Sequence, residues 1–354
     1  MIDLLVAGAG PAGAATAIRA AMAGLSVVVV EPRPAPIDKA CGEGIAHSAV
    51  EYLSRLGVAP AGRPFFGIRY LDANHVVDAR FRSGPGLGVR RTTLQRALLD
   101  RLAELDVPVV RGRVEAITQT AHSVTAAGFT ARYLAASDGL HSPIRRQLGL
   151  GESTGRRRRA GDLGFFSSHD AGQPRRGLRR HYVVRPWSEL VEVYWSSLGE
   201  AYVTPVADDL VGVAVLTSAR GSFDSHLEAF PALRRRLAGA PEASAVLGAG
   251  PLRQRVRGRV AGRVLLVGDA AGYVDALTGE GIAVALRTSA ELVRCVQADR
   301  PAEYDAAWRR VSWECRFLTG SLLWARNSSL LAPRIVPAAA RLPGVFGAVV
   351  NQLA

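Results

Sequence analysis

The stretch MIDLLVAGAGPAGAA, residues 1–15, decides the fold. An apolar run, Ile2–Ala7, precedes Gly8, Gly10 and Gly13 in GxGxxG spacing, and an alanine-rich helical stretch follows. In such a strand–turn–helix unit, the first glycine permits a tight turn, the second lets the backbone approach a pyrophosphate, and the third lets the helix pack closely on the strand. The pyrophosphate then lies against the helix N-terminus. The stretch therefore predicts a buried strand with a dinucleotide site at its carboxyl end.

An acidic residue, Glu31, ends the next apolar run. Residues 27–30 are four valines, which is typical of a parallel strand buried on both faces. A carboxylate at the end of this second strand can accept hydrogen bonds from the ribose hydroxyls of an adenosine. GxGxxG alone is a weak motif, but strand, helix, second strand and acid in this order make it informative.

The composition is that of a globular chain. Its 354 residues, 48% of them hydrophobic, can bury one large or two ordinary cores. Asp3 and the glycines interrupt the first apolar stretch, so we expect no signal peptide, and no run is long enough for a spanning helix. The three cysteines have neither CxxC nor metal-ligand spacing, so we expect no disulfide framework and no metal site. These features predict a cytoplasmic location.

The formal charge of +13 allows two interpretations. Lys39 is the only lysine, and the arginines are scattered except at 156–159 and 175–180. No nucleic-acid module accompanies the charge, so we expect no nucleic-acid binding and interpret the charge as an aid in attracting an anionic cofactor or substrate. The alternative is a binding protein whose arginine-rich surface holds an anionic polymer or membrane.

The middle of the chain changes character. In the part of the chain that precedes the middle, periodicity predicts a helix at 91–105, a strand at 108–113 and a hairpin within 114–130. A further strand should end at a turn at 137–139, and a helix should then start at Ser142 and Pro143. Alternating β-branched and aromatic residues then predict antiparallel strands at 181–184, 190–195, 201–206 and 210–217, with Asp208 and Asp209 in a turn. Residues 155–177 have no clear period, and we predict a mobile loop or irregular insertion there.

After these strands, the sequence again shows the strand, glycine-rich loop and helix pattern of its N-terminus. Residues 263–267 predict a buried strand, and a glycine-rich loop leads into a helix that begins near 279–281. Two dinucleotide-type segments therefore enclose the sheet, and both ends should close one cofactor site. Residues 301–354 predict helices broken by Pro333, Pro337 and Pro343. Their apolar faces most simply pack on the core; alternatively, they line an apolar substrate mouth or touch a membrane surface.

Three separated segments together resemble one family. GxGxxG with Glu31, DGLHSPIR at 138–145 and GDAAG at 268–272 are similar to the fingerprints of FAD-dependent oxidoreductases of the para-hydroxybenzoate hydroxylase type, which include geranylgeranyl reductases and flavin-dependent halogenases. The resemblance implies an α/β fold with a Rossmann-like FAD-binding domain, an inserted antiparallel sheet and C-terminal helices. The implied domains are 1–65 with 86–154 and 251–300 for FAD, 66–85 with 155–250 for the substrate sheet, and 301–354 for the helices.

The resemblance also implies a set of cofactor residues. Asp269 would accept a hydrogen bond from a ribityl hydroxyl, and the segment KACGEG at 39–44 would flank the flavin. Amides of the helix that opens at Gly279, Glu280 and Gly281 would stabilise negative charge on the reduced ring. The full set is Gly8, Gly10, Ala12, Gly13, Glu31, Arg33, Lys39, Cys41, Gly42, Gly44, Arg91, Asp138, Gly139, Asp269, Gly279, Glu280 and Gly281. NADPH or NADH would dock transiently as reductant, since no second GxGxxG occurs.

The reaction is less well defined than the cofactor. We favour hydroxylation of a phenolic or polyketide-derived aromatic substrate, because several segments resemble actinobacterial monooxygenases that accompany polyketide synthases. The alternative is reduction of prenyl double bonds in a lipid-like substrate, as in geranylgeranyl reductases. Halogenation is less favoured, because the WxWxIP signature is missing. Candidate catalytic residues on the central sheet are His181, Tyr194 and Tyr202, each able to donate to or deprotonate a phenol.

Overall fold

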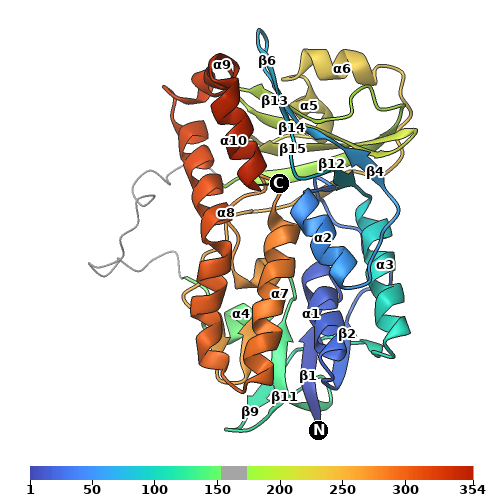
Figure 1. The fold of residues 1–354 in the computed structure, drawn as a ribbon, viewed down its shortest axis with the longest axis vertical. Coiled ribbons are helices and arrows are strands. Elements are labelled where there is room, and N and C mark those ends of the chain that lie inside the picture. Colours follow the sequence, from blue (N-terminus) through green and yellow to red (C-terminus); the bar gives the residue numbers. More distant parts are fainter. Residues whose placement is uncertain (153–173, 354) are drawn as a thin grey trace.

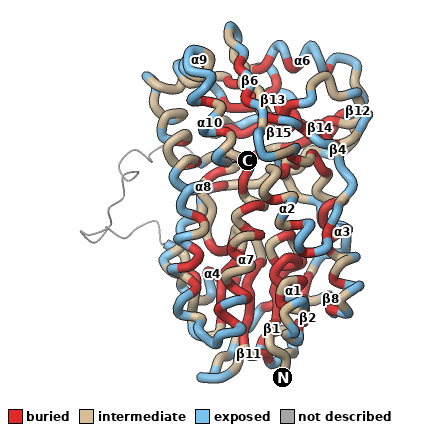
Figure 2. Tube along the Cα trace, viewed as in Figure 1, coloured by how far each residue is buried: buried red, intermediate tan, exposed pale blue. Residues whose placement is uncertain are grey.

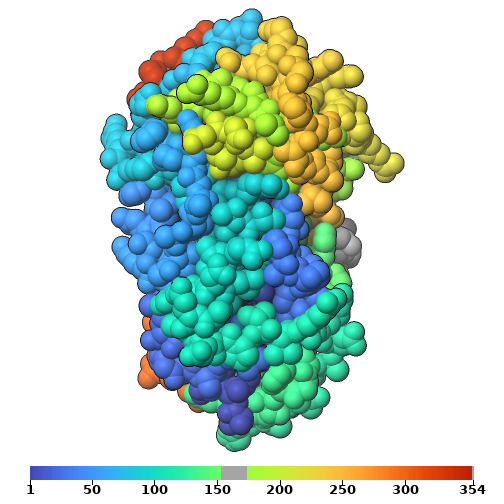
Figure 3. Space-filling model, turned by 90° about the vertical axis from the view of Figure 1, so that its right-hand side faces the viewer, coloured from blue at the N-terminus to red at the C-terminus, as the bar shows by residue number. Residues whose placement is uncertain are grey.

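The protein is described by a computed structural model over residues 1–152 and 174–353. Figure 1 shows an elongated molecule with a parallel sheet and its helices at the end that holds the N-terminus, and a second sheet at the opposite end. The turned, space-filling view in Figure 3 shows residues of about 180–250, in yellow-green to yellow, gathered over the blue and teal N-terminal third. The two sheets therefore lie one above the other along the long axis.

The parallel sheet is built around the first strand of the chain. Its parallel members, in spatial order, are β18 (Val264–Leu266), β11 (Phe129–Ala136), β1 (Ile2–Ala7), β2 (Val27–Glu31) and β8 (Val109–Arg111). Antiparallel pairing adds β17 (Val260–Ala261), β10 (Val124–Ala126) and β9 (Ile117–Gln119), for eight strands in all. Both predicted N-terminal strands are confirmed, and strands from the two ends of the chain lie within one sheet.

Helices cover this sheet closely. They are α1 (Pro11–Met22), α2 (His47–Arg55), α3 (Arg91–Glu104), α4 (Pro143–Gln147) and α7 (Gly281–Gln297). Helix α1 packs on β1 and β2 and contacts α3 and α7 on either side (Figure 1). A Cβ on Gly13 would come within 1.9 Å of the Gly8 carbonyl oxygen, so only glycine permits this packing. Figure 2 shows the resulting core as buried residues gathered along β1, β11, α1 and α7.

The second sheet is mainly antiparallel. Its order is β16 (Leu247–Ala249), β12 (Arg176–Val183), β15 (Leu210–Thr217), β14 (Gly199–Ala207), β13 (Val191–Ser196), β5 (Gly67–Leu71) and β6 (Val76–Arg80). Among the described residues of this sheet, β13 and β5 are the one pair that runs parallel. Helices α5 (Phe223–Leu227) and α6 (Pro231–Leu237) cover its outer face. A third, small sheet holds β3 (Gly44–Ile45), β7 (Gly86–Gly88) and β4 (Arg63–Phe65).

The C-terminal helices join the two halves. They are α8 (Tyr304–Asn327), α9 (Ile335–Arg341) and α10 (Pro343–Leu353), with short 3₁₀ turns η1 (Gly268–Ala271), η2 (Pro301–Glu303) and η3 (Ala332–Arg334). In Figure 1, α8 runs beside both halves, while α9 and α10 pack on β6. Within the described ranges, no helix has both the length and the apolar character that crossing a membrane requires.

The predicted fold class is confirmed, with two local corrections. The strand predicted at 181–184 begins at Arg176, because β12 is held by pairing with β15 rather than by its own arginine-rich sequence. The irregular insertion therefore ends earlier than predicted, and its remainder, apart from 174 and 175, lies outside the described residues. Pro337 does not break a helix: it is the third residue of α9, where the backbone N–H would have no intrahelical acceptor.

Candidate functional site

One cavity of about 980 Å³ lies between the carboxyl edge of the parallel sheet, the inner face of the second sheet and the C-terminal helices. Of the cofactor residues implied by the resemblance, every one except Gly13 lines this cavity. They come from both ends of the chain, as expected from the order of the motifs. The cavity is at the upper end of the usual size range of ligand sites, roughly 300–1,000 Å³.

The first glycine turn is held by the acid that the sequence singled out. Gly8 has φ of +108°, the left-handed conformation that favours glycine. The buried Glu31 accepts hydrogen bonds at Oε2 from the Ala9 amide, at 2.8 Å, and at Oε1 from the Arg33 amide and Nε. Glu31 therefore ties the end of β2 to the glycine turn and places its carboxylate in the cavity wall.

An ion pair joins motifs from opposite ends of the chain. Lys39 Nζ lies 2.9 Å from Asp269 Oδ2, a contact that spans 230 residues of sequence. Arg145, from the middle motif, donates at 3.0 Å to the carbonyl oxygen of Ala270 and at 2.7 Å to Gln254 Oε1. The segments KACGEG, DGLHSPIR and GDAAG are thus fastened to one another around the cavity.

Asp138 has one buried carboxylate oxygen for which the described residues supply no hydrogen-bond partner. Its Oδ2 accepts a hydrogen bond from the Ile144 amide at 3.0 Å, whereas Oδ1 is buried and has no hydrogen-bond partner among the described residues. Burial raises the pKa of this carboxyl group. Beside it, Ser142 caps α4 by accepting from the Arg145 amide at 2.9 Å, which confirms the predicted helix start. An unpaired oxygen in the cavity wall fits a ligand hydroxyl or amide.

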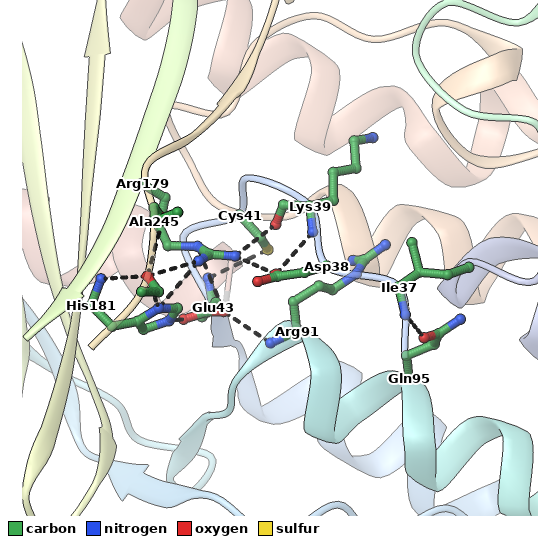
Figure 4. A network of polar contacts seen from close by, with 11 residues as sticks. Ile37, Asp38, Lys39, Cys41, Glu43, Arg91, Gln95, Arg179, His181 and Ala245 are labelled. Atoms are coloured by element: carbon green, nitrogen blue, oxygen red, sulfur yellow. Dashed lines mark hydrogen bonds and ion pairs between the residues drawn. The ribbon is translucent and has the colours of Figure 1, made fainter. Parts of the chain in front are cut away.

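The KACGEG loop is anchored by a buried network that the sequence did not predict (Figure 4). Glu43, with φ of +61°, accepts from His181 Nε2 at 2.6 Å and from the Arg91 amide at 2.9 Å. His181 Nδ1 accepts a hydrogen bond from the Arg179 guanidinium at 3.1 Å. Nε2 is therefore the ring nitrogen that carries the proton. Arg179 also donates to the Lys39 carbonyl oxygen at 3.2 Å. The loop is therefore fixed to β12 and to the start of α3.

The three candidate catalytic residues are not brought together. His181 is fully buried and does not line the cavity. Its ring is linked to the site by the hydrogen bond that it makes with Glu43. Tyr194 lies on the outer face of the sheet, in the core under α5 and α6, and its hydroxyl donates to Glu192 Oε2 at 2.6 Å. Tyr202 does line the cavity, and its hydroxyl donates to the Leu277 carbonyl oxygen at 2.7 Å. Strand alternation places Tyr194 on the wrong face for contact with a ligand in the cavity.

One half of the cavity is lined by apolar side chains. An apolar substrate mouth lined by the C-terminal helices was the alternative interpretation of the sequence. The inner face of the sheet supplies Ile68, Tyr70 and Val193, and the C-terminal helices supply Leu322, Ile335 and Phe346. Tyr70 packs on Phe346 with ring centroids 4.7 Å apart. Leu342, Val345 and Val349 line the cavity and are also exposed, by 58%, 59% and 40%. They therefore form its mouth, and the C-terminal helices do line an apolar opening.

The glycine surfaces and the unpaired carboxylate fit a flavin nucleotide. Gly42, Gly139 and Gly279 line the cavity, and a Cβ on any of them would meet no atom within 4 Å, so these backbones face open space. Residues 1–189 match the family model "FAD binding domain". The chain belongs to this family and is an FAD-dependent oxidoreductase. The predicted FAD cofactor and the predicted class of FAD-dependent oxidoreductase are confirmed.

Two sequence relatives that span most of this chain are reductases. Menaquinone reductase of Mycolicibacterium smegmatis is 30% identical over 338 residues, covering 86% of this chain and 79% of that protein. Digeranylgeranylglycerophospholipid reductase 2 of Methanosphaera stadtmanae is 26% identical over 313 residues, covering 81% of this chain and 75% of that protein. Rifampicin monooxygenase of Rhodococcus hoagii is 31% identical but covers only 41% of this chain and 33% of its own length. The favoured likeness to monooxygenases is thus supported only partially.

Solved structures agree on the architecture. Flavin-dependent brominase Bmp2 superposes with a TM-score of 0.80 at 18% identity, covering 99% of this chain and 93% of its own. At this identity the likeness concerns the fold alone. It supports the combination of parallel sheet, antiparallel sheet and C-terminal helices described above.

Proposed function

We propose that the enzyme reduces carbon–carbon double bonds in the prenyl chain of a lipid-like substrate, with a reduced nicotinamide as the transient electron donor. This is the alternative that the sequence left open, and it replaces aromatic hydroxylation as the main hypothesis. Bound FAD supplies hydride-transfer chemistry. The protein's part is to orient the chain, exclude water and supply a proton.

The observation that carries the proposal is the apolar half of the cavity. The same cavity runs from the glycine loops to the mouth at Leu342, Val345 and Val349. Aliphatic and aromatic side chains line it there, as burial of a long hydrocarbon chain requires, since the free energy gained scales with the apolar area removed from water. Two of the relatives named above are reductases of menaquinone and of a digeranylgeranyl phospholipid, molecules that carry polyprenyl chains.

The chain's own groups can prepare the cofactor for this task. The N-terminus of α7 at Gly281 offers backbone amides to the cavity, and the helix dipole there favours negative charge. Arg91 adds positive charge to the wall near the glycine loops, where Lys39 lies in its ion pair with Asp269. These groups favour an electron-rich, reduced ring.

The substrate's nature also suggests where the enzyme works. Trp313, Phe317 and Trp324 on α8 are exposed, by 64%, 44% and 52%, and the cavity mouth is apolar. With the arginines Arg309 and Arg310 also on α8, this face suits the surface of an anionic membrane. We propose a cytoplasmic enzyme that touches the membrane peripherally and takes a lipid through the mouth.

The test separates the possible reactions by product mass. The flavin is reduced anaerobically by NADPH and, separately, by NADH, and the reduced enzyme is mixed with prenylated lipids or phenols with and without oxygen. We expect addition of two hydrogens to the prenyl chain without oxygen. Addition of one oxygen to a phenol, with prenyl lipids unchanged, would show a monooxygenase instead. Reduction confined to a quinone ring would also contradict the proposal.

A further inference from the structure

A carboxyl group that the account above leaves unused lies in the cavity wall. Glu280 directly precedes α7 and is only 7% exposed, yet it lines the cavity. Its Oε2 is buried and has no hydrogen-bond partner among the described residues. Since buried polar atoms are nearly always paired, a buried, unpaired carboxyl oxygen in a ligand cavity indicates a group kept for that ligand.

The position of Glu280 is at the junction of the two halves of the cavity. Gly279 and Gly281, on either side, belong to the turn that should face the cofactor. Leu277 and Thr278, just before it, line the apolar half, where Thr278 Oγ1 lies 2.7 Å from Thr319 Oγ1 of α8. A substrate double bond brought to the cofactor from the mouth would therefore come past this carboxyl group.

The surroundings raise the pKa of the Glu280 carboxyl group, so that a substantial fraction of it is protonated near neutral pH. Burial is the largest influence and raises the pKa of Glu280 to about 7; the charge of Glu314 on α8 acts in the same direction. The nearby Cys315 thiol on α8 and the charge of Arg287 on α7 lower the pKa and partly offset these effects. A pKa near the working pH is the value that suits a general acid.

We propose that Glu280 is the proton donor in the reduction of the substrate double bond. This deepens the proposed function and rests on it. The carboxyl O–H bond breaks and its proton joins one alkene carbon, while the other carbon receives a hydride from the reduced cofactor. The π bond is lost, two C–H bonds form, and the substrate gains two electrons. Glu280 is left as a carboxylate that regains a proton from solvent, and the nicotinamide restores the hydride, so one reduced nicotinamide and one proton are consumed.

The test uses Glu280→Gln, which keeps the shape and removes the acid, and Glu280→Asp, which keeps an acid on a shorter arm. Glu228→Gln, directly after α5, is the matched control, because that glutamate is exposed and does not line the cavity. Stopped-flow measurements follow two half-reactions of the FAD-loaded protein: reduction by the nicotinamide and reoxidation by a prenyl lipid. Infrared difference spectra between pH 5 and 9 follow the protonated carboxyl group independently of turnover.

We expect Glu280→Gln to be reduced by the nicotinamide at the wild-type rate and to be reoxidised by the prenyl lipid at least about 100-fold more slowly. Glu280→Asp should retain an intermediate rate with a shifted pH profile, and the carboxyl band titrating near pH 7 should vanish in Glu280→Gln alone. Reoxidation of Glu280→Gln within threefold of wild type, or an unchanged band, would overturn the inference. Wild-type enzyme that reduces no prenyl lipid would overturn the proposed function and this inference together.

Discussion

At the scale of residues, the site depends on polar contacts between side chains that are far apart in the sequence. Glu43 and His181 are 138 residues apart and both are fully buried, at 2% and 0% exposure. Lys39 and Asp269 link the chain's two ends by an ion pair whose side chains are 32% and 29% exposed. For the buried pair, removing His181 costs more than the pair contributes, because Glu43 stays buried without that partner.

Replacing His181 by alanine should therefore lower the free energy of unfolding by about 3 kcal/mol, because Glu43 Oε2 would lose its donor while Oε1 keeps the Arg91 amide. FAD affinity should fall as well, since Glu43 fixes the KACGEG loop. Urea unfolding and FAD titration measure the two effects, and His122→Ala, at an exposed turn, is the control. A wild-type unfolding free energy in His181→Ala would show that the network does not hold the loop.

Glu280 should make the stability of the apoprotein depend on pH. Its pKa is about 7 in the folded chain against an ordinary value of 4.5. The folded state therefore binds the extra proton in this interval, and stability is lost as pH rises through 7, by up to about 3 kcal/mol. Between pH 4.5 and 8, the unfolding free energy of Glu280→Gln should consequently rise relative to wild type. Parallel pH curves for the two proteins would mean that the carboxyl group is not buried in its neutral form.

At the scale of elements, the second sheet and the C-terminal helices enclose the apolar half of the cavity. Alternation along the strands directs Tyr202 of β14 inward and Tyr194 of β13 outward, although both were equal candidates in the sequence. The register between β13 and β14 and the covering of one face by α5 and α6 decide this difference. Alternation predicts that two faces exist, but only the packing of the whole chain shows which one meets the cavity.

Filling the apolar half should abolish substrate use and spare the cofactor. Leu322→Trp adds bulk to the apolar lining from α8. We expect FAD affinity and reduction by the nicotinamide to stay near wild type and reduction of long prenyl lipids to fall at least about tenfold. Leu330→Trp, at a site 70% exposed, is the control. Equal loss of FAD from Leu322→Trp would show that this half is not a separate substrate chamber.

At the scale of the whole molecule, the order of motifs predicted a single site closed by both ends of the chain, and the structure has that arrangement. GxGxxG, DGLHSPIR and GDAAG are local patterns with a physical basis in turns and helix starts, so they could be found in the sequence. The partners of His181 and the unpaired oxygen of Glu280 could not, because long-range contacts create them. The C-terminal helices likewise carry apolar residues with no pattern that distinguishes a cavity lining from a core.

The most direct test of the central claim is a crystal structure of the purified protein with its FAD. The account predicts one FAD whose adenosine lies by Glu31 and Gly10, whose ribityl chain meets Asp269, and whose flavin ring lies by Gly42 and Gly281. One face of that ring should be open to the chamber beside Tyr70 and Phe346. An FAD bound away from Asp269, or a ring whose face is closed off from that chamber, would contradict the account.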